Sequence, residues 1–568
     1  MLNFIIGRNN SGKTEKIRAL IAERASENKK CILIVPEQFS FESERSILEK
    51  IGAKKMLNVD ILSFTRLAFV INEQYGKALN KTIDDGTRKV LMSLSLEALS
   101  GKLEYFKRFS SKPALLSNLL TFVTELKQCA VTPDEIAEIS GKTGNKSLGK
   151  KLSELSLIAA SYDALVSRSF FDDENLLTIA ADMISETDFF DGKAVYFDAF
   201  CGFTKQERNC IKSILPKAEN VFISLCTDRD LSREGVSVFE NVNSEFSHLK
   251  ECAAEQNVGV SSPEILNVKE DGRSPELVYL EKYLCGEESE PYKEECDNIV
   301  VCAAGNRADE ADFVACEIKK LLRCNPTLRC RNIAVIERTA GTYDKELSES
   351  FKKYGVPMFE DKRRPIGIQP VMVFVKCLLA LCAEGFSTES FMRLLKTGLT
   401  ALSGDEISEL ENYAFLWNID GSKWRRDFTE NPDGLGFDVT EKSQEKLIRL
   451  NDIRKRSVLP VLAFKKDFEE ADGEKKSRLI YEFLIKNGVT ERLREKIEYL
   501  VSSGDTVLCE EQDTVWATLM DMLGKMASAI GETVITAKRY SELFNILLSA
   551  VTLGSLPQEL DSVTVGAA

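Results

Sequence analysis

Apolar residues near the start of the chain alternate between short unbroken runs and a helical spacing. The runs Leu2–Ile6, Cys31–Val35 and Leu57–Phe64 are typical of strands, and Thr14–Ser26 has the spacing of an amphipathic helix. The run Cys31–Val35 is apolar throughout, as in strands that are buried on both faces of a parallel sheet. This order predicts an α/β fold with a parallel sheet.

The spacing becomes helical from about residue 75 to residue 185. One face of a helix predicted there carries Leu115, Leu119, Leu120, Val123 and Leu126. Strands return at Ala194–Phe197 and Val221–Leu225. Strands, a helical block and further strands together predict a sheet that is interrupted by a helical insertion.

Residues 251–300 carry 13 acidic and 4 basic side chains and are predicted to be a connector. A second alternation of strands and helices follows them. The next expected elements are strand Asn298–Ala304, helix Ala308–Leu322, strand Ile333–Glu337 and helix Tyr343–Tyr354. Helices dominate from about 370 to 530, and the last expected elements are helix Arg539–Ala550 and strand Leu560–Val565. We therefore expect two α/β units, each with a helical insertion, in a chain that ends like a fragment of something longer.

The 568 residues include 75 basic and 89 acidic side chains, for a net charge of −14. This charge argues against a protein that coats nucleic acid through bulk positive charge, although a local basic groove remains compatible with it. No apolar run reaches the roughly 18 residues of a membrane helix, and the opening apolar run is too short for a signal peptide. A cytoplasmic protein is therefore expected.

The chain has fifteen cysteines but a single histidine, His248, and no Cys-x-x-Cys pair. Zinc sites, Ser-His hydrolase triads and Cys-His dyads need several such residues in defined patterns. These classes of site are not expected here.

The segment Gly7–Thr14 matches the phosphate-loop pattern G-x-x-x-x-G-K-[ST], after a predicted strand and before a predicted helix. Glycines let backbone N–H groups surround phosphate oxygens, and the start of the helix adds its positive end. Lys13 would reach the β- and γ-phosphates of ATP, and the Thr14 hydroxyl would bind Mg²⁺. The candidate nucleotide-binding residues in this loop are Gly7, Asn10, Ser11, Gly12, Lys13 and Thr14.

Hydrolysis would need an acidic residue at the end of a second strand to hold Mg²⁺, and commonly a Glu beside it to activate water. Asp198 follows the run Ala194–Phe197 and is the candidate second Mg²⁺ ligand, with a helix cap or loop carboxylate as the alternative. Ala199 occupies the position where a helicase would have Glu. Glu207 stands three residues after Thr204, which is the spacing of a capping box. The sequence thus predicts nucleotide binding with doubtful turnover.

Several strings along the chain, together with the phosphate loop, resemble the AddB (RexB) family of bacterial helicase–nuclease subunits. They include Val35–Phe41 (VPEQFSF), Ile61–Phe69 (ILSFTRLAF), Tyr196–Phe200, Asn332–Arg338, Tyr354–Pro357 and Leu560–Gly566. These matches span almost the whole chain.

The resemblance implies a superfamily 1 helicase-like fold with two P-loop (RecA-like) parallel-sheet domains, each with a helical insertion. The domains expected are 1A at 1–80 and 186–285, insertion 1B at 81–185, 2A at 286–370 and 531–568, and insertion 2B at 371–530. It implies an AddA-type helicase–nuclease partner, DNA ends as substrate, and Chi scanning by an inactivated motor during double-strand-break repair. The iron–sulfur cluster and the nuclease domain of the family are expected only beyond this chain. Arg338 matches a motif whose arginine meets nucleotide phosphate in active helicases.

The resemblance also points to single-stranded DNA contacts after the second, third and fourth strands. The candidates are Gln38, Phe39, Ser40, Thr65, Arg66, Phe69, Phe200 and Phe203. Aromatic rings can stack on bases, and Arg and hydroxyl groups can hold phosphates. Residues 1–70 carry 12 basic and 8 acidic side chains, and this net positive charge suits a polyanion. For each phenylalanine, the alternative is packing in the core. Lys362–Arg364 is a further possible phosphate contact or a solvated loop.

Three functions remain open from the sequence. The first is a nucleotide-binding, DNA-scanning subunit without motor activity. The second is an active superfamily 1 DNA-dependent ATPase and helicase, and the third is a scaffold with a vestigial phosphate loop.

Overall fold

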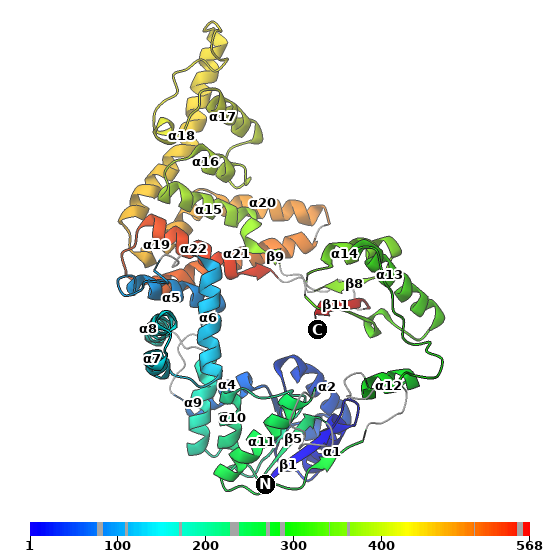
Figure 1. Ribbon diagram of the computed structural model, residues 1–568. Helices are drawn as coiled ribbons and strands as arrows, with labels where there is room; N and C mark the ends of the chain where they lie inside the picture. Colours follow the sequence, from blue (N-terminus) through cyan, green and yellow to red (C-terminus); the bar gives the residue numbers. More distant parts are fainter. Residues whose placement is uncertain are drawn as a thin grey trace. The chain divides into compact units, whose positions relative to one another are not determined.

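The computed structural model divides the chain into two compact units, Met1–Ile299 and Val300–Ala568 (Figure 1). It describes residues 1–76, 83–107, 112–169, 173–227, 238–267, 273–283, 290–339, 341–360, 364–504, 506–553 and 561–567. Among these residues, no helix is both long and apolar enough to cross a bilayer.

The first unit is built on a six-stranded sheet whose strands all run parallel, in the order β3-β2-β4-β5-β1-β6. The strands are β1 (Leu2–Gly7), β2 (Cys31–Ile34), β3 (Val59–Leu62), β4 (Ala194–Phe197), β5 (Asn220–Cys226) and β6 (Glu264–Ile265). The expected α/β class and parallel sheet are confirmed.

Both faces of this sheet are buried, because successive side chains along each strand point to opposite sides. Phe4 and Ile6 belong to the core under helices α4, α9, α10 and α11, whereas Ile5 belongs to the core under α1 and α2. The helices of this unit that cover the sheet are α1 (Lys13–Ser26), α2 (Ser40–Ile51), α4 (Phe64–Tyr75), α9 (Asp173–Glu186), α10 (Lys205–Ile214) and α11 (Glu240–Glu255). The short α3 (Ala53–Met56) precedes β3, and α12 (Pro275–Tyr283) follows β6.

Four helices between α4 and α9 form a block of their own in the first unit (Figure 1). They are α5 (Asp85–Ala98), α6 (Pro113–Gln128), α7 (Pro133–Lys142) and α8 (Lys146–Ser169). Helix α5 packs on α6 and α8, and α7 packs on α8. The expected insertion range also included α9, but this helix packs on α4 and α10 beside the sheet.

The second unit contains a three-stranded parallel sheet in the order β7-β11-β8, formed by β7 (Ala334–Glu337), β11 (Val563–Ala567) and β8 (Met358–Glu360). Helices α13 (Arg307–Cys324) and α14 (Asp344–Tyr354) cover one face. A short antiparallel pair, β9 (Arg364–Pro365) with β10 (Thr552–Leu553), leads into and out of a helical region.

That helical region lies between β9 and β10. Its helices are α15 (Pro370–Ala383), α16 (Thr388–Leu395), α17 (Gly404–Leu416), α18 (Glu441–Glu470), α19 (Gly473–Lys486), α20 (Val489–Ser502), α21 (Thr506–Ile530) and α22 (Ala537–Ala550). Helix α22 packs on α15, so it completes the helical region.

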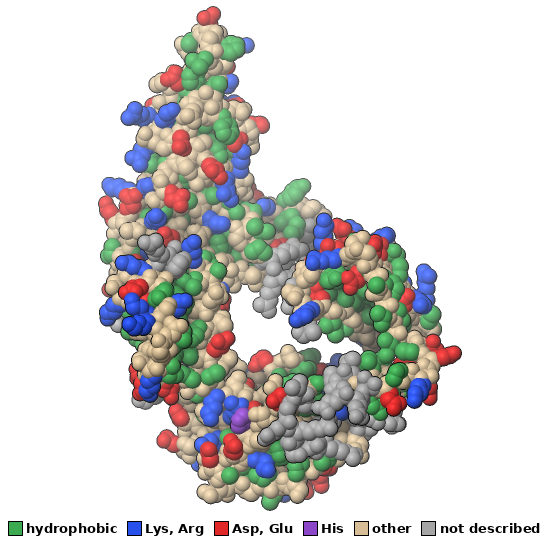
Figure 2. Space-filling model, in the orientation of Figure 1, with side chains coloured by type: hydrophobic (Ala, Val, Ile, Leu, Met, Phe, Trp, Pro, Cys, Tyr) green, Lys and Arg blue, Asp and Glu red, His purple; other side chains and the backbone are tan. Residues whose placement is uncertain are grey.

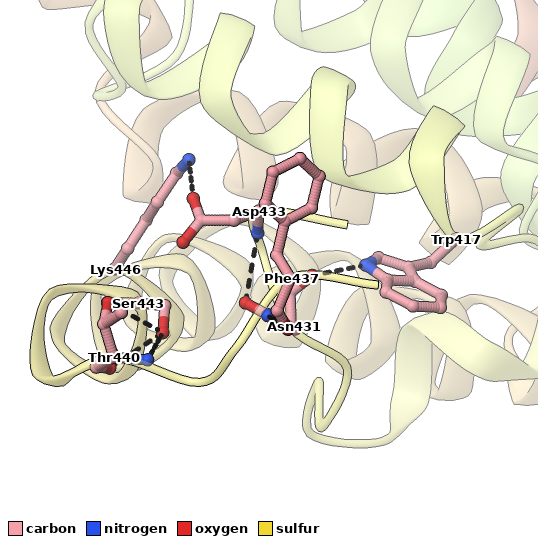
Figure 3. A network of polar contacts seen from close by, with 7 residues as sticks. All are labelled: Trp417, Asn431, Asp433, Phe437, Thr440, Ser443 and Lys446. Atoms are coloured by element: carbon pink, nitrogen blue, oxygen red, sulfur yellow. Dashed lines mark hydrogen bonds and ion pairs between the residues drawn. The ribbon is translucent and has the colours of Figure 1, made fainter. Parts of the chain in front are cut away.

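The loop from α17 to α18 is ordered around Asn431 (Figure 3). The backbone carbonyl of Asn431 accepts a hydrogen bond from Trp417 Nε1 at 3.0 Å, and its Nδ2 donates to the Phe437 carbonyl at 3.0 Å. Its Oδ1 accepts from the Asp433 backbone N–H at 3.2 Å. These hydrogen bonds connect Asn431 with the end of α17 and with Phe437, whose ring is exposed.

The predicted strand Asn298–Ala304 was wrong, whereas the predicted connector 251–300 ends at the boundary between the two units but also contains regular elements. Asn298–Ala304 is not a strand, and Val300 and Val301 are exposed, because no neighbouring strand pairs with this run among the described residues. The predicted connector contains helix α12 and strand β6, and β6 pairs with β1 at Ile5–Glu264 and Ile6–Ile265.

Candidate functional site

The candidate site lies at the carboxyl edge of the six-stranded sheet, where several strands end together. Ile34 at the end of β2 is in register with Leu62 of β3 and with Phe197 of β4. Gly7 at the end of β1 is level with Cys226 of β5. Ligands of open α/β sheets bind outside this edge, because the loops that follow the strands converge there.

The backbone of the phosphate loop takes an unusual conformation before α1 begins at Lys13. Asn10 and Gly12 both have positive φ angles, of 57° and 89°. No side chain caps the start of α1, in contrast to Ser63 at α4 and Thr204 at α10, which accept hydrogen bonds there. The first N–H groups of α1 therefore have no side-chain acceptor at the cap position and are available to an anion.

Gly7 is required by the close approach of the surrounding chain. A Cβ atom at this position would lie 2.4 Å from Ser11 Oγ and 2.7 Å from the Leu266 carbonyl oxygen. The Leu266 N–H also donates to the Ile6 carbonyl at 2.7 Å, which fixes the segment after β6 against β1. The phosphate loop is thus packed between α1 and the segment that follows β6.

The Lys13 ammonium is held by the loop itself. It donates to the Gly7 carbonyl at 2.8 Å and to the Arg8 carbonyl at 2.7 Å, with Ser11 Oγ at 3.5 Å. Its bonds go to neutral oxygens, and no described carboxylate pairs with it, so its charge remains available beside the start of α1. A positive charge and a helix N-terminus together favour an anionic ligand.

Asp198 is buried directly after β4, at the same edge of the sheet as the phosphate loop. Its backbone N–H donates to the Ile34 carbonyl at 3.1 Å, and its Oδ1 accepts from the Ser224 hydroxyl of β5. Strand β5 lies between β4 and β1, so Asp198 and the phosphate loop are on the same edge, two strands apart. The following residue, Ala199, has a left-handed φ of 65°, a conformation that is uncommon for alanine.

The loop after Ala199 ends in the predicted capping box. Thr204 Oγ1 accepts from the Glu207 N–H at 3.2 Å, and the Glu207 carboxylate accepts from the Thr204 N–H at 2.7 Å. The prediction that Glu207 caps a helix is confirmed, and this carboxylate is occupied at the start of α10.

Most of the candidate DNA contacts are exposed near the ends of β2 and β3. Gln38 and Phe39 lie in the short helix Glu37–Phe39, and Ser40 begins α2, where its hydroxyl donates to the Glu37 carbonyl at 2.8 Å. Thr65, Arg66 and Phe69 lie on α4 with exposed side chains, and Arg66 is 3.6 Å from Glu44 of α2.

The two phenylalanines after β4 differ in exposure. The Phe203 ring is buried in the core, with centroids 6.0 Å from Phe197 and 6.1 Å from Phe64. This placement does not fit a DNA contact and agrees with the alternative of core packing. Phe200 is half-buried, 4.9 Å from Phe203 and 5.5 Å from Phe64, so its ring joins the loop after β4 to the start of α4.

The remaining candidates belong to the second unit. Arg338 is exposed directly after β7. In the segment Lys362–Arg364, residues 362 and 363 and the side chain of Arg364 lie outside the described part of the structure.

Two polar residues near the carboxyl end of β5 were not anticipated. Ser224 holds the Asp198 carboxylate, and Thr227, which follows β5, is buried and donates to Asn243 of α11. A serine inside the apolar run Val221–Leu225 is the signal that points to the first. Nothing in the sequence pattern identifies the second, because Asn243 lies sixteen residues further on.

Sequence comparisons relate this chain to known proteins. Residues 4–281 match the family model described as ADDB, N-terminal. Over the whole chain, the sequence is 29% identical to the B subunit of the ATP-dependent helicase/deoxyribonuclease of Acetivibrio thermocellus and 29% identical to that of Clostridium acetobutylicum. The protein of the same name from Thermoanaerobacter sp. is 29% identical over 99% of the chain. In each case the match covers 50% of the relative, so the chain spans about half the length of these curated relatives. The chain is thus similar over its whole length to AddB proteins, and the match corresponds to their N-terminal portion.

Proposed function

We propose that this chain binds ATP and Mg²⁺ at the segment Gly7–Thr14 and Asp198. The observation that carries the proposal is the uncapped start of α1 beside the unneutralised Lys13 ammonium. The α1 N–H groups and Lys13 would hold phosphate oxygens, and Lys13 would exchange its bonds to the Gly7 and Arg8 carbonyls for them. Thr14 and Asp198 supply the oxygen ligands that Mg²⁺ prefers, with phosphate oxygens and water completing its shell.

The same edge of the sheet is the proposed path of single-stranded DNA. Phe39 and Phe69 expose aromatic rings at the ends of β2 and β3, and Arg66 is exposed beside them. Exposed rings can stack on bases irrespective of sequence, and a guanidinium can hold the backbone. Gln38, Ser40 and Thr65 add polar groups that can contact phosphates or base edges.

The proposed biological role is that of an AddB-type component in the processing of double-strand DNA ends. An AddA-type helicase–nuclease is the proposed partner, and the names of the relatives, each of which is called one subunit of a helicase/deoxyribonuclease, support an assembly of this kind. Ala199 occupies the position of a water-activating Glu, and Glu207, in the first turn of α10, is committed to a helix cap. We therefore propose that the chain does not drive translocation and that it scans DNA for a Chi-type sequence.

The test is ATP binding and turnover by the 568-residue chain, with and without single-stranded DNA. Binding is read as the rise in melting temperature with millimolar ATP and Mg²⁺, because a ligand of the native state must stabilise it. Lys13→Ala should abolish the rise, whereas Lys30→Ala, an exposed lysine of the same unit, should preserve it.

Each alternative predicts a different result. DNA-stimulated turnover near 1 per second, within the usual range of enzymes, would replace the proposal by an active helicase. A wild-type melting temperature that ATP does not change would replace it by a scaffold with a vestigial loop.

A further inference from the structure

A group of exposed lysines lies on the helical block of the first unit, away from the phosphate loop in the sequence. We define the lysine surface as Lys102, Lys107, Lys146, Lys150 and Lys151. The first two flank the segment 103–106 before α6, and the other three occupy the first two turns of α8. Lys and Arg side chains gather on the surface over this block in Figure 2.

The segment 103–106 is fixed to α8 by a buried carboxylate. Glu154 of α8 accepts hydrogen bonds from the backbone N–H groups of Glu104 at 2.8 Å, Tyr105 at 3.1 Å and Phe106 at 3.3 Å. Leu103 is buried beside them. Hydrogen bonds to a charged acceptor are about twice as strong as neutral ones, so the two backbone segments that carry the lysines are held against each other.

Tyr105 sits between the two elements and orients a lysine. Its hydroxyl is 3.2 Å from Ser147 Oγ, and Lys151 Nζ is 5.4 Å from the ring centroid. The ring of Tyr105 therefore supports the ammonium of Lys151 through a cation–π contact.

The charges of this surface are poorly balanced. Lys150 pairs with Glu104 at 3.0 Å, but among the described residues no ion pair involves Lys102, Lys107, Lys146 or Lys151. Three lysines also crowd the first turns of α8, where the helix dipole disfavours cations, and no acidic residue is present in its first turn. In a chain with a net charge of −14, such a local excess of positive charge requires a reason other than solubility.

We infer that the lysine surface binds the phosphodiester backbone of DNA, independently of sequence. Ammonium groups on a rigid support neutralise phosphates and release counterions, which is the main source of non-specific affinity for DNA. A protein partner fits less well, because lysine is depleted at protein–protein interfaces relative to the remaining surface. This inference rests on the proposed DNA-binding role but adds a contact at a separate place in the first unit.

The experiment compares Lys146→Gln/Lys150→Gln/Lys151→Gln with the wild-type chain by fluorescence anisotropy at several salt concentrations. A labelled duplex and a labelled oligo-dT are measured separately, because the phosphodiester backbone of either can be the ligand. On the preferred DNA, the triple variant should bind about tenfold to a hundredfold more weakly at 0.1 M salt. The slope of log K against log salt should fall by about 0.9 for each lost duplex contact, or about 0.7 for a single strand.

Two variants serve as matched controls. Lys146→Arg/Lys150→Arg/Lys151→Arg keeps the charges and should keep both affinity and slope. Lys442→Gln/Lys466→Gln/Lys496→Gln removes three exposed lysines from α18 and α20 and should leave DNA binding unchanged.

The possible results are distinct. An unchanged affinity and salt slope in the Lys-to-Gln variant of α8 would overturn the inference alone. Failure of the wild-type chain to bind either DNA would overturn it together with the proposed DNA-binding role. Tighter wild-type binding of poly-glutamate than of either DNA would assign the surface to an acidic protein instead.

Discussion

The two parallel sheets of the molecule differ in how they are covered. In the six-stranded sheet, β1, β2 and β4 are buried on both faces by helices. In the three-stranded sheet, Val335, Val563 and Val565 lie under α13 and α14, whereas Ala334 and Ile336 on the opposite face are exposed. Strands with similar apolar sequences therefore have different surroundings, and the cover of a sheet is set by the helices packed on it.

The run Ile299–Ala304 shows that an apolar run also needs a neighbouring strand to pair with. Its composition matches that of β2, but no strand lies beside it among the described residues, and it is irregular. A strand satisfies its backbone polar groups through its neighbours, so an apolar run without a neighbour has no reason to be one. The candidate site belongs to the first sheet, where helices cover both faces and the strands pair with their neighbours.

The largest difference should come from an aromatic residue inside each sheet. Phe4→Ala removes a buried ring that contacts Phe246 at a centroid distance of 4.6 Å, and should lower the free energy of unfolding by about 3–5 kcal/mol. Phe359→Ala, the same change at a half-buried position of β8, should cost about 1–2 kcal/mol. Urea denaturation measures both, and equal costs would contradict the comparison.

A glycine at the end of a strand provides the second contrast. Gly7→Ala introduces a Cβ that collides with Ser11 Oγ and the Leu266 carbonyl, and should cost about 1–3 kcal/mol and eliminate the ATP-induced rise in melting temperature. Gly566→Ala in β11 adds a Cβ in open space and should change stability by less than about 1 kcal/mol. Differential scanning fluorimetry with and without ATP reads both effects, and a normal ATP response in Gly7→Ala would refute the role of this loop.

The smallest effect is expected on the exposed face of the three-stranded sheet. Ile336→Thr should change the free energy of unfolding by no more than about 0.5 kcal/mol, because the side chain is already in water. Ile32→Thr, at a fully buried position of β2, replaces a buried ethyl group by a hydroxyl, so it should cost about 2–3 kcal/mol. A large loss of stability in Ile336→Thr would show that something covers this face of the sheet.

Much of the first sheet could be predicted from the sequence, because its strands are unbroken apolar runs between helical segments. The expected strand Ala194–Phe197 matches β4 residue for residue. Strand β6 was missed because it has two residues, Glu264 and Ile265, inside an acidic stretch, where neither periodicity nor composition marks a strand. Pairing with β1 makes it a strand, and pairing is not a local property.

In the candidate site, too, features carried by consecutive residues could be predicted, whereas features that depend on tertiary packing could not. The phosphate loop could be predicted because its chemistry lies in eight consecutive residues, Gly7–Thr14. The contact between Asp198 and Ser224 depends on the register of β4 with β5, and the burial of Phe203 depends on the packing of α4. The lysine surface was not anticipated either, since it joins residues about forty positions apart through the Glu154 carboxylate.

The position of β1 in the sheet order has a consequence for synthesis of the chain. Both of its neighbours come late, since Leu2 pairs with Val221 of β5 and Ile5 with Glu264 of β6. Strand β1 is therefore synthesised more than two hundred residues before β5, the neighbour with which it pairs along its whole length. Helices α5 to α8 make their contacts locally and can assemble in the meantime, because contacts of short sequence separation form first. The phosphate loop follows β1 directly, so we expect it to reach its final shape only after β5 has been made.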